Sequence, residues 1–493
     1  HMSDNQILAV PEDVLVACKM CAEAMASEHV LVLNDGQYSF FHEGFFDYAF
    51  AYRFAARGHD LLRLLRGSEQ HLFRRAQVRQ ILLYERKVRF KQYVSDLDAL
   101  LSAPDIRQHI KEVVYAILAA STDPQQEEWG VLSKLLTNES QIPGVWRVIG
   151  QSVAWFALLD SLGIIERWLY ADDKSTAQNT LWWLTRVQPQ MPDRVAELLE
   201  PYMADPIKYH DELAYAVNNR DVGTSDRFFD LFMRLVQAGF YDEAPISHEF
   251  WLMLSSIADT RAEKACAALA VFFDRLRQQA VSAGQSNPFD EDTGTIADDH
   301  QNDDVLSKCA SNAPEHFVAW ALPFVLKVAD ATAIREGDPP WSDGVWRYRS
   351  FGMAHRADEH LLSALATALG RLAESKTETF SKYTTQLRDS KLETAQFLLV
   401  RSCTSGGKPF ADDLAALFCE QPVRLGLGYI NHARGPVHDA LRIAARYCSD
   451  ENLLKLEDLL LSYSPTWEWH RKEGECTGNY RGVTQFGLLE MIP

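Results

Sequence analysis

The spacing of apolar residues over most of this chain restricts its fold more than any other feature. Across residues 61–84 apolar side chains recur every three or four positions, which places them on one stripe of an α-helix. The period returns in residues 225–239, where Ser225 or Asp226 can cap the helix and Gly239 can end it. Helices of about 12 residues joined by about 4 to 6 residues would repeat about 20 to 25 times along the chain. We therefore predict an all-α fold.

Helices in this number must share their apolar faces, and a superhelical stack lets them do so. No fixed-period signature of a tetratricopeptide, ankyrin or leucine-rich repeat is legible in the sequence. We therefore expect an irregular HEAT/TPR-like α–α superhelix. Residues 284–304 interrupt it, because they are rich in Gly, Ser, Asn and Asp and almost free of apolar residues. This acidic flexible loop is predicted to separate a first half, residues 59–283, from a second half, residues 305–493.

The beginning of the chain has a different pattern. Two short β-favouring runs flank Asn34-Asp35-Gly36, and the Asp-Gly step supplies the positive φ values of a tight hairpin turn. A helix on either side completes a winged-helix-like module, predicted over residues 3–58. Its expected elements are a helix over residues 11–27, strands over 29–33 and 37–41, and a helix over 43–56.

The net charge of the chain limits the kinds of molecule that it is expected to bind. A net charge of −19 opposes attraction of the whole protein to nucleic acid or to an anionic membrane surface. The segment from Arg53 to Lys91 is a local exception, because basic residues outnumber acids there. We interpret its Arg74, Arg75 and Arg79 as part of a solvated helix face that contacts a neighbouring domain.

Cysteine usage and hydropathy indicate a cytoplasmic protein. The eight cysteines are scattered, so we expect reduced core thiols, with Cys18 and Cys21 packed inside the first helix. The longest apolar run, residues 317–326, contains Pro323 and is shorter than the roughly 20 residues that span a bilayer. Neither a membrane helix nor a secretory signal is therefore expected.

Motifs that carry catalysis are missing from the sequence. The Gly406-Gly407-Lys408 step is followed by Pro409 and lacks the spacing of a phosphate-binding Walker A loop. No GxSxG elbow, HExxH helix or GxGxxG turn is present. We expect a binding protein rather than an enzyme, with no metal site of its own.

One loop has the composition of a protein interface. Residues 338–349 combine Pro and Gly with aromatic and arginine side chains, the residue types that dominate binding energy at interfaces. The candidate partner-binding residues are Trp341, Trp346, Arg347, Tyr348 and Arg349.

Residues 39–51, SFFHEGFFDYAFA, resemble the winged-helix module that follows the nucleotide-binding core in bacterial STAND NTPases of the NACHT type. Residues 68–82, SEQHLFRRAQVRQIL, are similar to the helical linker of the same family. The resemblance implies that His42 contacts the β-phosphate of ADP and holds the resting state. It further implies that ADP or ATP with Mg²⁺ is bound only by an NTPase domain absent from this chain.

By this resemblance the chain is the ligand-sensing and autoregulatory C-terminal region of a longer STAND protein. The helical array would recognise a foreign protein, such as a phage protein, and would control an effector domain in antiviral defence, with the parent protein oligomerising on activation. Two alternatives remain open. The chain is a free-standing helical-repeat scaffold for protein–protein interaction, or its winged helix and basic segment bind nucleic acid with a steep salt dependence.

Overall fold

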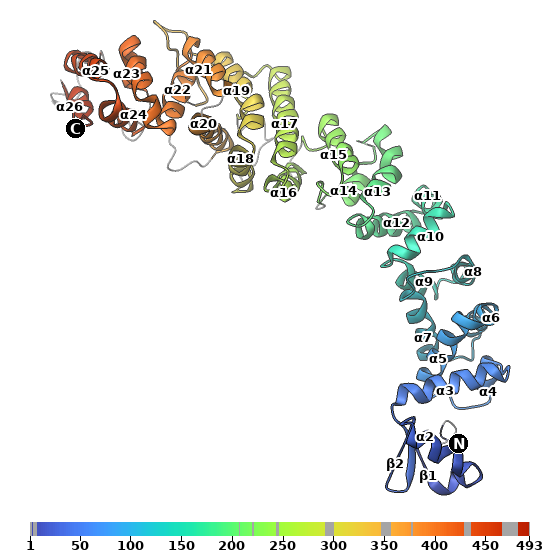
Figure 1. The fold of residues 1–493 in the computed structure, drawn as a ribbon. Helices are drawn as coiled ribbons and strands as arrows, with labels where there is room; N and C mark the ends of the chain where they lie inside the picture. The colour runs from blue at the N-terminus through green and yellow to red at the C-terminus, as the bar shows by residue number, and fades with distance from the viewer. Residues whose placement is uncertain are drawn as a thin grey trace, which may run out of the picture. The chain divides into compact units, whose positions relative to one another are not determined.

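The computed structural model describes residues 2, 7–206, 208–218, 221–242, 246–290, 300–346, 356–375, 378–427, 435–465 and 482–492. The chain forms two compact units, His1–Gln190 and Met191–Pro493. The boundary between them lies inside the segment predicted as residues 59–283. The described residues include 25 α-helices and one small sheet, so the predicted fold class is confirmed. It is an irregular HEAT-like helical array with a small winged-helix-like module (Figure 1).

The three-stranded sheet of the N-terminal module contains the predicted hairpin. Strand β2 (Leu31–Asn34) pairs with β3 (Gln37–Phe40), and Asp35 and Gly36 have φ values of 47° and 72°. A two-residue turn with both φ values positive matches the right-handed twist of the strands, so the sequence-based expectation is confirmed. Strand β1 (Ala9–Pro11) was not predicted from the sequence. It pairs with the other edge of β3 to give the order β1-β3-β2.

The predicted helix over residues 11–27 is divided into two elements. A 3₁₀ segment, η1 (Glu12–Cys18), precedes α2 (Lys19–Ser27), and Cys18 at the junction has a φ of −130° that no continuous helix tolerates. Only Ala22 of α2 is buried, packed with Val10 and Tyr38 of the sheet. Cys18 and Cys21 are exposed, so the prediction that they pack in a core was wrong.

Helices of the first unit pack on their second neighbours as well as their first. Helices α3, α5, α7 and α9 contact one another in succession, and α4, α6 and α8 form a second row against them. Each helix therefore buries its apolar stripe against helices of its own row and of the other row, as in a stacked helical repeat. The bounds are α3 (Glu43–Ala56), α4 (Leu61–Arg66), α5 (Phe73–Val88), α6 (Phe90–Ser102), α7 (Gln108–Ala119), α8 (Gln126–Leu135), α9 (Ile142–Ile149), α10 (Val153–Ser161), α11 (Ile164–Leu169) and α12 (Lys174–Val187).

The second unit repeats this alternation. Helices α13, α15, α17 and α19 form one row, and α16, α18, α20, α22 and α24 form the other. The bounds are α13 (Pro192–Leu199), η2 (Glu200–Ala204), α14 (His210–Val217), α15 (Asp226–Ala238), α16 (Ile246–Ala258), α17 (Ala262–Ser282), α18 (His300–Asn312), α19 (Pro314–Ala331), α20 (Ala357–Ser375), α21 (Glu378–Asp389), α22 (Glu393–Gly406), η4 (Lys408–Phe410), α23 (Ala411–Glu420), η5 (Pro422–Gly426), α24 (Gly435–Tyr447), α25 (Asp450–Ser462) and α26 (Val483–Leu489).

Helix α15 follows the sequence closely. The Ser225 hydroxyl accepts the Phe228 N–H at 3.0 Å as the N-cap, and Gly239 ends the helix with a φ of 84°. The predicted acidic loop 284–304 is shorter than expected, because α18 begins at His300. Buried Val305 and Leu306 favour this helix, which extends into the polar residues before them. Residues 291–299 lie outside the described residues.

Candidate partner-binding surface

Helix α5 has one buried face and one exposed face. Val78, Ile81 and Leu82 are fully buried, and they occupy the stripe that the sequence pattern predicted. Arg75 and Arg79 are exposed, and Leu83 is half-buried. Because these three residues are four positions apart, they lie in one row on the helix surface.

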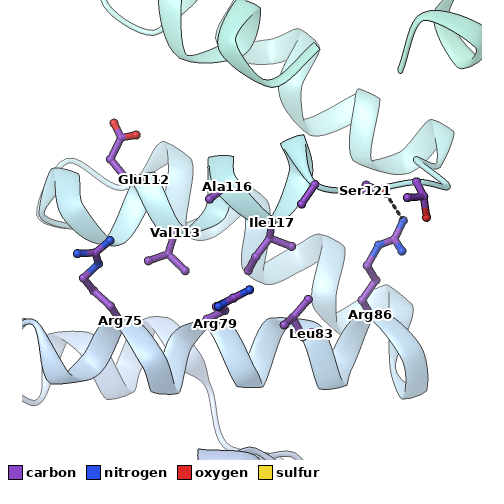
Figure 2. Close-up of a pocket in the computed structure, with 11 residues that line it drawn as sticks. Arg75, Arg79, Leu83, Arg86, Glu112, Val113, Ala116, Ile117 and Ser121 are labelled. Carbon is purple, nitrogen blue, oxygen red and sulfur yellow. Dashed lines mark hydrogen bonds between the residues drawn. The ribbon is translucent and has the colours of Figure 1, made fainter. Parts of the chain in front are cut away.

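A cavity of about 340 Å³ lies between this row and helix α7. Figure 2 shows Val113 and Ile117 of α7 pointing toward the row on α5, whereas Glu112 points away from it. Val113 and Ile117 of α7 are buried at its apolar wall, and Leu83 faces them from α5. We call this cavity the arginine groove. Its lining residues are Arg75, Arg79, Leu83, Arg86, Glu112, Val113, Ala116, Ile117, Ala120, Ser121 and Thr122.

Arg86, at one end of the arginine groove, is held by internal contacts. Its guanidinium donates to Glu128 Oε1 at 2.9 Å, to Ser121 Oγ at 2.9 Å and to the Asp123 carbonyl at 2.5 Å. Glu128 is fully buried, and the hydrogen bond to it raises the pKa of Arg86. Arg86 therefore serves to neutralise a buried carboxylate and has little capacity left for a ligand.

The only acid of the groove lining, Glu112, is also engaged within the chain. Its carboxylate accepts from Arg147 Nη1 at 2.6 Å and from Gln108 Nε2 at 2.6 Å. Arg75 and Arg79, in contrast, make no ion pair within 4.0 Å in the part of the chain that the structure describes. The groove therefore holds two positive charges that are not neutralised from within.

Arg74 does not belong to this surface. Its side chain is buried, and Nη1 donates to Gln77 Oε1 at 2.5 Å. The interpretation of Arg74, Arg75 and Arg79 as one solvated face is therefore corrected. On a helix, Arg74 points about 100° away from Arg75, toward the packed side.

Three tyrosines border the exposed face of α5 on its other side. Tyr48 and Tyr52 of α3 are 49% and 56% exposed, and each contacts the ring of Tyr84 of α5 edge-on, at centroid distances of 6.1 and 6.0 Å. We call Tyr48, Tyr52 and Tyr84 the tyrosine cluster. Tyrosine and arginine are among the side-chain types enriched at the centres of protein interfaces.

Two buried acids, one on α5 and one on α6, lie on the packed side of α5. Glu85 of α5 is fully buried, and burial together with the neighbouring Asp96 of α6 raises its pKa to about 8. Burial also raises the pKa of Asp96. The nearby Arg89 donates to the Ala55 carbonyl at 2.6 Å. The raised pKa of Glu85 favours its protonated, uncharged form at neutral pH.

His42, singled out by the family resemblance, is the N-cap of α3. Its Nδ1 accepts the Gly44 N–H at 3.0 Å, and the side chain is exposed. Since Nδ1 accepts, a neutral imidazole carries its proton on Nε2. The structure thus places a ring N–H donor on the surface at the start of a helix.

Two tryptophans of the loop predicted as an interface, Trp341 and Trp346, make contacts within the second unit. Trp346 is only 2% exposed, and its Nε1 donates to the Asp358 carbonyl at 3.0 Å. This burial removes Trp346 from the list of partner-binding candidates. Trp341 is half-buried, and its backbone pairs with Lys391 and Glu393 at 2.8 Å. Arg347, Tyr348 and Arg349 lie outside the described residues.

A carboxylate organises this loop. Asp343 is fully buried and accepts the N–H groups of Val345 and Trp346, at 3.0 and 2.6 Å, and the hydroxyl of Thr394. The cationic groups of Arg335 and Lys391 lie over the ring of Trp341, at 5.7 and 5.9 Å from its centroid. These contacts give the loop a structural role.

Within the described ranges, no cluster of three or more His, Cys, Asp or Glu side chains could hold a metal ion. In the same residues, no single helix has the length and apolar character to cross a membrane. Helices α9 and α10 pass that test only when taken together, and a bend of 103° separates them.

No protein-family model matches the sequence, and a search of curated proteins finds no match. Crystal structures of Kap121p and of a Kap121p variant are similar at 11% identity. The variant aligns 92% of this chain with 45% of its own at a TM-score of 0.29, and Kap121p aligns 97% with 48% at 0.24. This chain therefore spans less than half the length of either, and at these TM-scores the likeness carries no argument.

Sequence reasoning missed the apolar wall of the groove and the tyrosine cluster. The spacing of Arg75, Arg79 and Leu83 by four was a usable signal, because it places all three in one row of a helix. Nothing in the sequence indicated that Val113 and Ile117 lie opposite them. That proximity depends on the packing of α5 against its second neighbour.

Proposed function

We propose that this chain is a helical-repeat scaffold that binds a protein partner through the exposed face of α3, α5 and α7. Stacked helices commonly offer extended surfaces to other proteins. The observation that carries the proposal is that one side of the exposed face of α5 holds the two unpaired arginines of the groove and the other side holds the tyrosine cluster. Arginine and tyrosine contribute most of the binding energy at many interfaces.

A photocrosslinking experiment tests this proposal. Tyr84 is replaced by a photoreactive phenylalanine analogue, and the same analogue replaces the exposed Tyr447 of α24 as a matched control. In cells that produce the protein naturally, we expect irradiation to attach one defined protein at position 84 and not at position 447. Equal crosslinking at the two positions, or none at position 84, contradicts the proposal.

A finer proposal follows from the resemblance of residues 39–51 to the STAND winged helix. The chain would be the sensor region of such an NTPase in bacterial defence, and His42 would contact ADP held by the NTPase domain. The exposed Nε2–H of His42, at the start of α3, supports this proposal, because helix N-termini and ring N–H donors both favour phosphate.

In the full-length protein, the His42→Ala variant tests this role. We expect the purified variant to retain less ADP than the wild type, measured by chromatography of the nucleotide released on denaturation. His59→Ala is the control, because it removes another exposed histidine of the first unit, and it should retain as much ADP as the wild type. Unchanged ADP content in His42→Ala excludes the role.

A further inference from the structure

We propose that the arginine groove binds an acidic peptide segment, with carboxylates on Arg75 and Arg79 and an apolar side chain against Leu83, Val113 and Ile117. This inference rests on the proposed scaffold function and specifies the chemistry of the partner. It concerns the groove alone and is independent of the STAND resemblance.

The charge of the ligand follows from the two arginines. Both side chains are exposed and lack an acidic partner among the described residues, although acids exceed bases by 19 over the whole chain. Four residues of helix separate them, which is a rise of about 6 Å. Acidic residues at i and i+2 of an extended segment, or at i and i+4 of a helix, match this spacing.

The apolar wall distinguishes a peptide from a bare phosphate. Half-buried Leu83 faces Val113 and Ile117, each 7% exposed, across the cavity (Figure 2). Free phosphate or a nucleic-acid backbone would leave these apolar groups without a contact. An acidic peptide with one apolar residue covers them and adds about 25 cal/mol per Å² of apolar area buried.

The total charge of the chain also favours a short ligand over nucleic acid. A duplex extends its phosphates far beyond the groove, over a protein with a net charge of −19, and would be repelled there. A segment of a few residues interacts mainly with the charges nearest to it, because the Debye length is about 8 Å at physiological salt. Local complementarity is therefore enough for a peptide.

Selection from a random dodecapeptide library displayed on phage tests the inference with the whole chain as bait. Enriched peptides are synthesised with a fluorescent label, and their binding is measured by anisotropy. The test variant is Arg75→Glu/Arg79→Glu. The control is Arg57→Glu/Lys87→Glu, which makes the same change in charge at exposed positions outside the groove.

We expect the enriched peptides to combine at least two acids with an apolar residue. Their binding should weaken at least tenfold in the groove variant and less than threefold in the control. Circular dichroism verifies that both variants are folded.

Three results overturn the inference. The first is that the enriched peptides lack acids, or that their binding does not depend on the groove arginines. The second is that no peptide is enriched. The third is that a 20-base-pair duplex binds through the groove more tightly than the enriched peptides. The proposed scaffold function survives the first two results if crosslinking at position 84 still identifies a partner, so the two failures can be told apart.

Discussion

The face formed by α3, α5 and α7 and the loop of residues 333–346 both combine arginine with aromatic side chains. In the loop these groups are engaged within the chain: Trp346 is buried and Arg335 pairs with Asp330 at 2.6 Å. On the face, Arg75 and Arg79 have no such partner in the described residues. Composition alone therefore does not identify an interface, and the contacts that each side chain already makes must be counted.

The largest expected effect is on the loop. Trp346→Ala removes a large buried ring and its hydrogen bond to Asp358, so we expect a loss of about 4 kcal/mol in the free energy of unfolding of the second unit. Urea denaturation followed by tryptophan fluorescence and by circular dichroism measures it. A loss below about 1 kcal/mol would mean that the loop is not part of the core.

The second-largest effect is expected at Arg86, the groove arginine that is paired within the chain, in contrast to Arg75 and Arg79. Arg86→Ala leaves the buried Glu128 without its cationic partner, and we expect a loss of about 3 kcal/mol in stability. Urea denaturation of the double variant Arg86→Ala/Glu128→Gln provides the control, because it also removes the orphaned charge. A larger loss in the double variant than in Arg86→Ala would contradict this explanation.

The buried acid pair predicts a pH dependence. The pKa of Glu85 is about 8 in the folded protein and near 4.5 when unfolded, so its stabilising contribution is complete below about pH 4.5 and is lost as the pH rises through 8. The slope is at most about 1.4 kcal/mol per pH unit. Urea denaturation from pH 5 to 9 should show a shallower decline in Glu85→Gln. An unchanged pH dependence of stability in Glu85→Gln would mean that Glu85 does not hold an extra proton in the folded protein.

The smallest expected effect on stability is at the free arginines. Because Arg75 and Arg79 are exposed and make no ion pair, the variant Arg75→Ala/Arg79→Ala should change the free energy of unfolding by less than about 0.5 kcal/mol. The same denaturation assay measures it. A loss above about 1.5 kcal/mol would reveal a structural role and would remove both residues from the ligand-binding proposal.

Local patterns in the sequence predicted the local structure well. The positive φ values at Asp35 and Gly36 and the Ser225 cap and Gly239 stop of α15 follow from residue chemistry within a few positions. The strand β1 did not, because it is defined by pairing with β3, about 28 residues further along the chain. The break at Cys18 was not indicated by the sequence either. A three-residue strand is too short for a periodic signal.

The candidate site was predictable only in part. Arg75 and Arg79 were identified from charge, but the sequence did not distinguish them from buried Arg74. The opposite error was made for Trp346. Its loop has an interface-like composition, so it was predicted to be exposed, but it packs against Phe289. In both cases the deciding factor is contact with residues distant in the sequence, which a local pattern does not encode.

The central claim is that a protein partner contacts the face of α3, α5 and α7 rather than the loop of residues 333–346. The most direct measurement is the affinity of the crosslinked partner, once identified, for Tyr84→Ala and for Trp341→Ala. We predict at least a tenfold loss of affinity for Tyr84→Ala and less than a twofold change for Trp341→Ala. The opposite ranking would contradict the claim.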